Sequence, residues 1–268
     1  MPAAAPSAGP PARIAVLGAG FWARFQIAAW GEVPGAEVVA LYNRTRARAE
    51  ALAARFGIGA VYDDAEALLE EVRPDVVDVV TDVDTHARFV HLAARHRVPV
   101  ICQKPLAPDL DTARGMVAIC REAGVPLAVH ENWRWQHPLR ELKAVLDSGA
   151  IGRPFRAHVQ YASRFPVFEN QPFLAELEQF ILTDMGTHIL DVVRFLFGEP
   201  ARVTAQTSRV HPRIKGEDVA TLLLSIPRPE AAPGAGPVEP AGPAGVRDDL
   251  ACTVHLSYAS RWERERFP

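Results

Sequence analysis

The sequence predicts an α/β domain with a doubly wound parallel sheet, followed by an α+β domain with an open, mostly antiparallel sheet. In the first half, short apolar runs alternate with amphipathic helical stretches, which is the rhythm of βαβ units. After about residue 150, longer segments alternate apolar and polar residues, as antiparallel strands with one solvated face do. A chain of 268 residues has room for two such domains.

The first half contains five predicted strands, several of them nearly continuous apolar runs such as VVDVV and VPVIC. Such runs are typical of parallel strands that helices cover on both faces. The strands are expected at residues 13–17, 36–42, 75–80, 98–102 and 125–129. Helical patterns that begin near Thr or Asp follow the second, third and fourth strands, at residues 45–56, 84–96 and 109–123.

The second half is expected to hold four strands and one well-marked helix. The helix spans residues 182–197 and ends at Gly198, with Pro200 just beyond as a stop signal. The strands are expected at residues 154–165, 201–210, 218–226 and 250–260, and a shorter helical pattern covers 139–146. Residues 227–246 carry six prolines and four glycines without periodicity, which predicts a disordered loop. The predicted organisation is a disordered tail over 1–12, a nucleotide-binding domain over 13–132 and a substrate and oligomerisation domain over 133–268.

Composition excludes several classes of protein. Lys and Arg number 29 against 32 Asp and Glu, a net charge of −3 that does not suggest a nucleic-acid surface. The three cysteines form no CxxC pair, so a disulfide framework or a cysteine zinc site is not expected. The first dozen residues lack the basic start and apolar core of a signal peptide, and no apolar stretch reaches membrane-spanning length. These features predict a cytoplasmic protein that does not bind membranes.

A glycine-rich loop, GAGFWA at residues 18–23, follows the first strand and opens a helix. Glycines at Gly18 and Gly20 would let backbone amides approach a pyrophosphate, and a small residue at Ala23 would let the helix pack on the strand. The loop therefore predicts a dinucleotide site. The alternative is a simple tight turn between strand and helix.

The end of the second strand bears on the choice of cofactor. Dinucleotide-binding folds that prefer NAD carry an acidic residue there for the ribose, whereas this chain has Asn43 and Arg44. A guanidinium suits the extra phosphate of NADP. The pair favours NADP weakly, and NAD remains open because Arg44 is also explained as an exposed arginine at a helix start.

Gln103 and Lys104 stand at the carboxyl end of the VPVIC strand, the edge where ligands bind in open α/β sheets. Pro105 restricts the backbone of Lys104, which aims its side chain. Only three of the 29 cationic residues are lysines, and a lysine, unlike an arginine, exchanges its proton when buried. Lys104 is therefore a candidate catalytic residue, with a solvated surface charge as the alternative.

The predicted helix at 182–197 carries three polar residues. At 100° per residue, Asp184, His188 and Asp191 fall at 0°, 40° and −20°, on one face beside an apolar stripe. A carboxylate one turn from an imidazole suits acid–base chemistry. The alternatives are an ordinary helix-start aspartate with a surface histidine, and a metal site whose third ligand no spacing indicates.

Taken in order, these motifs resemble the glucose–fructose oxidoreductase, inositol dehydrogenase and MocA family, over nearly the whole ordered chain. The phrases FWARFQIAAW, QKPLAP and HENWRWQ resemble a D-apiose dehydrogenase-like branch of sugar dehydrogenases. The resemblance implies an N-terminal Rossmann domain and an NAD- or NADP-dependent oxidation or reduction of sugars or polyols. It also implies homo-oligomers through the C-terminal sheet, and a sheet that continues beyond the point where this chain stops.

The resemblance also implies roles for individual residues. Lys104, Asp184 and His188 become the catalytic set, with His188 as base, Asp184 orienting it or the substrate, and Lys104 polarising the reacting oxygen. Residues near the cofactor are Gly18, Gly20, Phe21, Trp22, Asn43, Arg44, Thr81, His86, Gln103 and Lys104, and residues near nicotinamide and substrate are Asn132 and Arg134. No metal is expected. The alternative function is a nucleotide-binding protein of the same fold without turnover, such as a sensor or a shortened copy.

Overall fold

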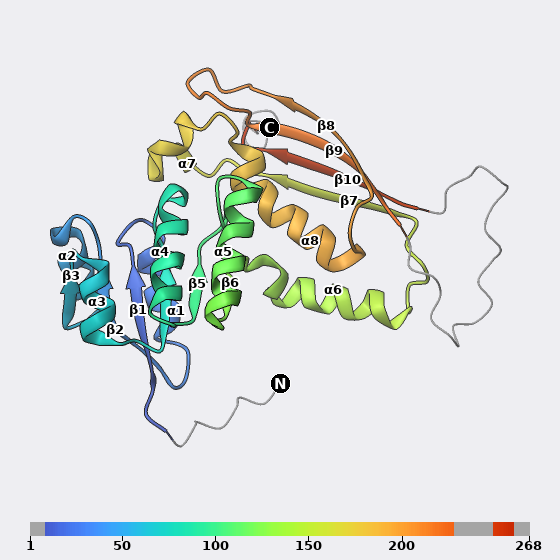
Figure 1. Ribbon diagram of the computed structural model, residues 1–268. Helices are drawn as coiled ribbons and strands as arrows, with labels where there is room; N and C mark the ends of the chain where they lie inside the picture. The colour runs from blue at the N-terminus through green and yellow to red at the C-terminus, as the bar shows by residue number, and fades with distance from the viewer. Residues whose placement is uncertain (1–8, 228–248, 260–268) are drawn as a thin grey trace. The chain divides into compact units, whose positions relative to one another are not determined.

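The computed structural model describes residues 9–227 and 249–259 (Figure 1). The chain divides into two compact units, residues 1–130 and 131–268. The disorder predicted for 1–12 and 227–246 falls largely on residues outside the described ranges. Among the described helices, none has the length and apolar character that a membrane crossing requires.

A fully parallel sheet of six strands forms the centre of the first unit, in the order β3-β2-β1-β4-β5-β6. The order reverses between β1 and β4, and open α/β sheets bind ligands at the carboxyl ends of strands beside such a reversal. The strands are β1 Ala12–Leu17, β2 Ala36–Tyr42, β3 Ala60–Tyr62, β4 Val76–Val79, β5 Val100–Cys102 and β6 Leu127–Val129. All five predicted strands are present, and β3 is an addition.

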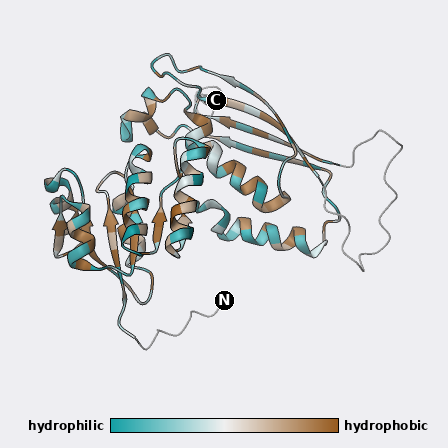
Figure 2. Ribbon diagram, viewed as in Figure 1, coloured by the Kyte–Doolittle hydropathy of each residue, from teal (hydrophilic) through white to brown (hydrophobic). Residues whose placement is uncertain are grey.

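Helices cover both faces of this sheet, as the continuous apolar strands predict. Ile14 and Val16 of β1 point into a core shared with the first two helices, whereas Ala15 and Leu17 point into a second core with the other three. Figure 2 shows hydrophobic strands between helices whose outer faces are hydrophilic. The helices are α1 Ala23–Trp30, α2 Arg46–Phe56, α3 Ala65–Val72, α4 Val83–Arg95 and α5 Leu110–Ala123.

The second unit is built on a mixed sheet of four strands in the order β7-β10-β9-β8. One face is apolar and buried and the other is more exposed, as the alternating burial along β9 and β10 shows. The pairs β10–β9 and β9–β8 are antiparallel as predicted, but β7 and β10 run parallel. The strands are β7 Arg156–Ala162, β8 Arg202–Ser208, β9 Val219–Ile226 and β10 Leu250–Ser257.

The helices of the second unit include α6 His137–Ser148, the short α7 Val167–Asn170 and α8 Thr187–Phe197. α8 contributes Ile189 and Val193 to the core beneath the sheet. A 3-10 turn at Trp133–Trp135 precedes α6, and another occupies Pro172–Glu176. The segment just before α8, Leu182–Gly186, is a π-helical turn, a feature often found at functional sites. The helix predicted over 182–197 is therefore present with a wider first turn.

Candidate active site

The glycine-rich loop has the conformation that only glycine permits at its first position. Gly18 has a φ of +119°, and a Cβ there would lie 2.4 Å from the carbonyl oxygen of Val80. Its amide donates to the carbonyl of Tyr42, which ties the loop to the end of β2. A Cβ on Gly20 would meet nothing within 4 Å. Gly18 thus makes the turn tight, and Gly20 leaves an open face over the loop.

Three features of this loop fit a bound pyrophosphate. Within the described residues, the amides of Gly20, Phe21 and Trp22 have no hydrogen-bond acceptor, and they lie at the start of α1. The guanidinium carbon of Arg24 lies 4.5 and 4.7 Å from the ring centroids of Phe21 and Phe25. The buried Nε of Arg24 also has no hydrogen-bond partner among the described residues. Unsatisfied donors at a helix N-terminus suit an anionic group. The residues present therefore fit a bound dinucleotide. Arg24 was not among the residues predicted to lie beside the cofactor.

Asn43 binds the loop itself. Its Oδ1 accepts from the amide of Ala19 at 3.1 Å, and its Nδ2 donates to the carbonyl of Thr45 at 3.0 Å. The side chain predicted to lie beside the cofactor therefore closes the loop in this structure. Arg44, next in the chain, is exposed and follows the carboxyl end of β2.

His86, which was expected beside the cofactor, is only 1% exposed in the structure. Its Nε2 lies 3.0 Å from the carbonyl oxygen of Thr81, and its Nδ1 lies 3.1 and 3.2 Å from those of Pro105 and Leu106. With both ring nitrogens occupied by backbone carbonyls, His86 ties the loop after β4 to the loop after β5. Thr81 stays half-buried at the sheet edge.

Lys104 stands at the carboxyl end of β5, as predicted, and is half-buried. Its amide donates to Oε1 of Gln103 at 2.9 Å, while the amide of Gln103 donates to the carbonyl of Val79 at 3.0 Å. The peptide bond between Lys104 and Pro105 is cis. The side chain of Gln103 thus accepts a hydrogen bond from the backbone of Lys104.

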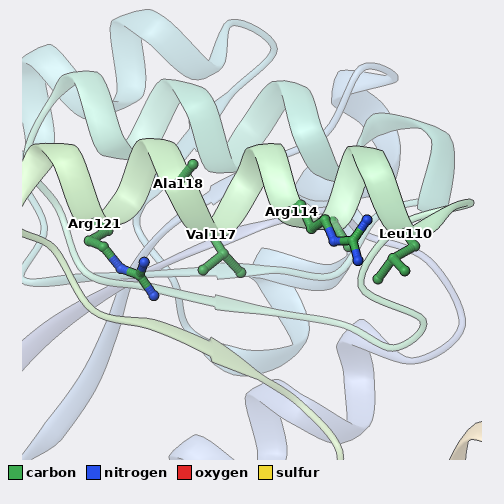
Figure 3. Close-up of a pocket in the computed structure, with 6 residues that line it drawn as sticks. Leu110, Arg114, Val117, Ala118 and Arg121 are labelled. Carbon is green, nitrogen blue, oxygen red and sulfur yellow. The ribbon is translucent and has the colours of Figure 1, made fainter.

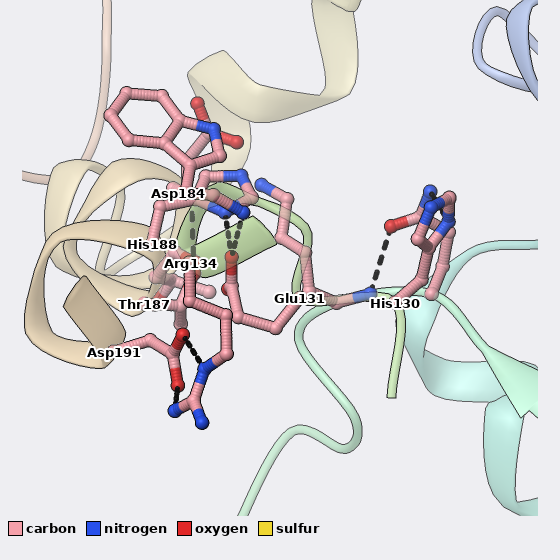
Figure 4. A network of polar contacts seen from close by, with 11 residues as sticks. His130, Glu131, Arg134, Asp184, Thr187, His188 and Asp191 are labelled. Atoms are coloured by element: carbon pink, nitrogen blue, oxygen red, sulfur yellow. Dashed lines mark hydrogen bonds and ion pairs between the residues drawn. The ribbon is translucent and has the colours of Figure 1, made fainter. Parts of the chain in front are cut away.

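His188 is held by a carboxylate that the sequence analysis did not select. Its Nδ1 lies 2.5 Å from Oε1 of Glu131, and both side chains are largely buried (Figure 4). The indole of Trp133 stacks on the imidazole, with centroids 5.1 Å apart and planes 11° apart. A donating Nδ1 leaves Nε2 as the lone-pair nitrogen, which is the state a general base requires. Glu131, which the sequence analysis did not single out, is therefore a carboxylate in direct contact with the His188 imidazole.

Asp184 lies in the π-helical turn, so the 100° step used to place it on one face with His188 does not hold there. The hydroxyl of Tyr258 donates to Asp184 Oδ2 at 3.4 Å and lies 3.5 Å from the hydroxyl of Tyr161. Burial, with the nearby charge of Asp184, raises the pKa of Tyr258, so this phenol stays protonated and keeps donating. Tyr258 is a second site residue that sequence reasoning missed.

Arg134 and Asp191 form a bidentate ion pair through Nε and Nη2 (Figure 4). Hydrogen bonding to Asp191 raises the pKa of the Arg134 guanidinium further. Two of the guanidinium nitrogens of Arg134 are thus bound to a carboxylate of α8, and its expected place beside the substrate stays a prediction. Asn132 begins the adjacent 3-10 turn, where its carbonyl accepts from the amide of Trp135.

Other parts of the described surface do not coincide with these residues. A shallow depression along α5, shown in Figure 3, contains none of the predicted site residues and is lined by Leu110, Ala113, Arg114, Val117, Ala118 and Arg121. Within residues 9–227 and 249–259, no group of three His, Cys, Asp or Glu side chains could hold a metal ion.

A parallel sheet in this order, with a glycine-rich loop after β1, defines a dinucleotide-binding protein. Residues 12–131 match the model of an oxidoreductase family with an NAD-binding Rossmann fold, and residues 139–232 match the GFO/IDH/MocA C-terminal domain. The chain belongs to the GFO/IDH/MocA family of oxidoreductases.

Two similar relatives are bacterial D-apiose dehydrogenases, in agreement with the branch that the motifs indicate. The chain is 50% identical to the protein of Rhizobium rhizogenes and 45% identical to that of Paraburkholderia graminis, over 95% of its own length in both cases. It spans 68% and 62% of the lengths of these relatives. A solved oxidoreductase of Agrobacterium radiobacter, in complex with NAD+, L-tartaric acid and magnesium, is 43% identical. That structure superimposes with a TM-score of 0.84, over 96% of this chain and 69% of the other.

Proposed function

We propose that the protein is an NAD(P)-dependent sugar dehydrogenase that oxidises a carbinol carbon of a sugar or polyol. The observation that carries the proposal is the Glu131–His188 pair, an oriented imidazole whose Nε2 is the lone-pair nitrogen. The two relatives named as D-apiose dehydrogenases support turnover over a nucleotide-binding protein without activity. D-Apiose and other aldoses are therefore the first substrates to test.

In the proposed reaction, His188 Nε2 takes the hydroxyl proton of the substrate as the carbinol C–H bond breaks. A nicotinamide dinucleotide held by the loop from Gly18 to Ala23 would supply the redox chemistry, as the acceptor of the hydride. Glu131 holds the imidazole and stabilises the positive charge that the ring gains. Asp184, with Tyr258 donating to it, binds a substrate hydroxyl, and the Lys104 ammonium polarises the reacting oxygen.

The roles of Lys104 and His188 are tested by single substitutions. Lys104→Ala and His188→Ala are expected to lower kcat by about 100-fold or more, the usual contribution of a positioned acid or base. Their affinity for the dinucleotide, measured by quenching of tryptophan fluorescence, is expected to stay near that of the wild type. Wild-type turnover in both variants would refute the assignment.

We propose further that Arg44 confers a preference for NADP. It is exposed just beyond β2, and the neighbouring Asn43 brings no carboxylate that would repel a phosphate. Arg44→Ala is expected to weaken NADPH binding about tenfold and to leave NADH binding unchanged, as the loss of one charge-assisted contact predicts. Equal effects on the two cofactors would rule this out.

The proposed assembly is a homo-oligomer joined through the C-terminal sheet. The face of that sheet away from α8 exposes Leu223, at 52%. Light scattering on the wild type and on Leu223→Lys tests this, and the expected result is a smaller particle for the variant. The proposed location is the cytoplasm, supported by three buried cysteines that form no disulfide.

A further inference from the structure

A carboxylate lies in the centre of the parallel sheet of the first unit. Asp78 on β4 is 1% exposed, and its register partners are Val16 on β1 and Ile101 on β5. Burying a carboxylate among apolar strands costs free energy unless hydrogen bonds compensate. Burial is also the main cause of a raised pKa for Asp78. A group retained at such a cost needs an explanation that core packing does not provide.

Two side chains of α1 donate to this carboxylate. Gln26 Nε2 lies 2.9 Å from Oδ1 and 3.0 Å from Oδ2, and Trp30 Nε1 lies 2.8 Å from Oδ2. Gln26 is itself only 7% exposed. Both oxygens of Asp78 therefore accept hydrogen bonds from side chains of α1.

The hydrogen-bond network continues from Gln26 to the carboxyl end of β5, where Lys104 lies. Gln103 Nε2 donates to Gln26 Oε1 at 2.6 Å and lies 3.4 Å from His130 Nδ1. Gln103 Oε1 then accepts from the amide of Lys104 at 2.9 Å. Three consecutive hydrogen bonds thus connect Asp78 to the backbone of Lys104, all of them within the first unit.

The direction of every hydrogen bond in this chain follows from its Lys104 end. A backbone amide only donates, so Gln103 must turn its oxygen toward Lys104 and its NH2 group toward Gln26. Gln26 then presents its oxygen to Gln103 and its NH2 group to the oxygens of Asp78. Neither amide can flip without losing two hydrogen bonds.

We propose that Asp78 is a positioning residue which, through Gln26 and Gln103, holds the backbone of Lys104 in the orientation that catalysis requires. The inference rests on the proposed role of Lys104 in the dehydrogenase reaction. It also explains why position 103 carries an amide. A carboxylate there would compete with Asp78 for the NH2 group of Gln26, and one of the two would lose its donor.

This competition gives a reciprocal test. With Asp78→Asn, the new NH2 group can donate to Gln26 Oε1 and turn Gln26 around. The NH2 group of Gln26 then suits Gln103→Glu, whose second oxygen still accepts from Lys104. Each single variant is expected to lower kcat by about tenfold or more, whereas the double variant recovers to within about threefold of the wild type. The KM for the dinucleotide should change little.

A second readout needs neither substrate nor cofactor. Hydrogen exchange of the Lys104 amide, followed by ¹⁵N NMR, should be about tenfold faster in each single variant and return toward the wild-type rate in the double variant. Gln26→Ala breaks the chain at its middle and serves if Asp78→Asn does not fold. Asp75→Asn is the matched control, because Asp75 accepts from the amide of Arg13 near the other end of β4 and should leave both readouts unchanged.

These outcomes distinguish the positioning role of Asp78, called the relay below, from the proposed function. Unchanged amide exchange and kcat in Asp78→Asn would overturn the relay. A double variant whose loss of kcat equals the combined losses of the two single variants would overturn it as well. If Lys104→Ala loses activity while Asp78→Asn keeps it, the proposed function stands and the relay fails. If exchange follows the pattern but no sugar is oxidised, the relay stands as a structural device and the proposed function fails.

Discussion

At the scale of single residues, the buried Glu131–His188 pair contrasts with an exposed carboxylate–imidazole pair on α6. The Glu131–His188 pair is largely buried and its atoms are 2.5 Å apart. The His137–Glu141 pair on α6 is exposed, with 3.8 Å between its atoms. Exposed pairs of this kind contribute little to stability, whereas a buried carboxylate sets the tautomer of its imidazole. Only the first pair is suited to acid–base chemistry.

Glu131→Gln is therefore expected to lower kcat by about ten- to 100-fold, because a neutral amide holds the imidazole without stabilising its protonated form. The KM for the sugar should change much less. Glu141→Gln, the same substitution in the exposed pair, should leave steady-state kinetics at wild-type values. Equal kinetics for the two variants would show that His188 acts without Glu131.

Glu131 could not be selected from the sequence because it lies 57 residues from His188. Asp184 is four residues before His188, a spacing that places both on one face of a regular α-helix. The π-helical turn turns by a different angle per residue, so this placement does not hold in the structure. The HENWRWQ motif contributed to the family resemblance, and Asn132 and Arg134 were predicted from it, but its glutamate was not among the predicted site residues. The positions of Lys104 and Gly18 were predictable, because a strand end and a βα turn are local features.

The charge of Asp78 predicts how stability depends on pH. Its pKa is raised in the folded state, mainly by burial, so the folded chain holds this proton more tightly than the unfolded chain. The stability that this proton contributes is fully present below the ordinary carboxyl pKa of about 3.9 and is lost as pH rises through the raised value. Asp78→Asn should therefore lose less free energy of unfolding than the wild type as the pH rises above about 4.

Urea denaturation at a series of pH values measures this slope, with Asp75→Asn as the control for a carboxylate that is hydrogen-bonded near the end of the same strand. Identical slopes for Asp78→Asn and the wild type would mean that the buried carboxyl titrates normally.

At the scale of elements, a loop supports the turn that carries Asp184. The amide of Ile181 donates to the carbonyl of Glu217, and the amide of Leu182 donates to Oε1 of the same residue. Gly216 allows this approach, since a Cβ there would lie 2.6 Å from the carbonyl oxygen of Leu177. The position of the π-helical turn thus depends on a contact 35 residues away in sequence.

Gly216→Ala is expected to destabilise the protein by about 1–3 kcal/mol, the usual cost of overpacking. Gly115→Ala on α5 should have the opposite sign, because a Cβ there meets nothing and alanine favours a helix by about 0.5–1 kcal/mol over glycine. Chemical denaturation of the two variants compares them directly. A stable Gly216→Ala protein would show that the loop yields without cost.

The accuracy of the element predictions followed the strength of the local pattern. The five strands and the helices at 45–56, 84–96 and 109–123 have continuous apolar runs or clear start signals, and the structure contains all of them. The three-residue strand β3 is too short to show a period, and α3 beside it was missed with it. The parallel pairing of β7 with β10 depends on strand order, which alternating residues do not encode.

At the scale of the whole molecule, each unit has its own apolar core and its own part of the proposed machinery. A dinucleotide that binds the folded first unit should raise the free energy of unfolding by about 2.7 kcal/mol at 100 times its Kd. NADPH is therefore expected to raise Tm in a calorimetric scan. Gly18→Ala, which places a Cβ against Val80, should abolish the shift. A shift that persists in this variant would place the dinucleotide elsewhere.

The central claim is that the chain oxidises a sugar with a nicotinamide cofactor. The measurement that tests it most directly is the rate of cofactor reduction by the purified wild-type chain, with NADP+ or NAD+ and a panel of aldoses and polyols that begins with D-apiose. The account predicts saturable, sugar-dependent formation of the reduced cofactor that His188→Ala abolishes. Tight cofactor binding without sugar-dependent reduction across the panel would contradict it and support a nucleotide-binding protein without turnover.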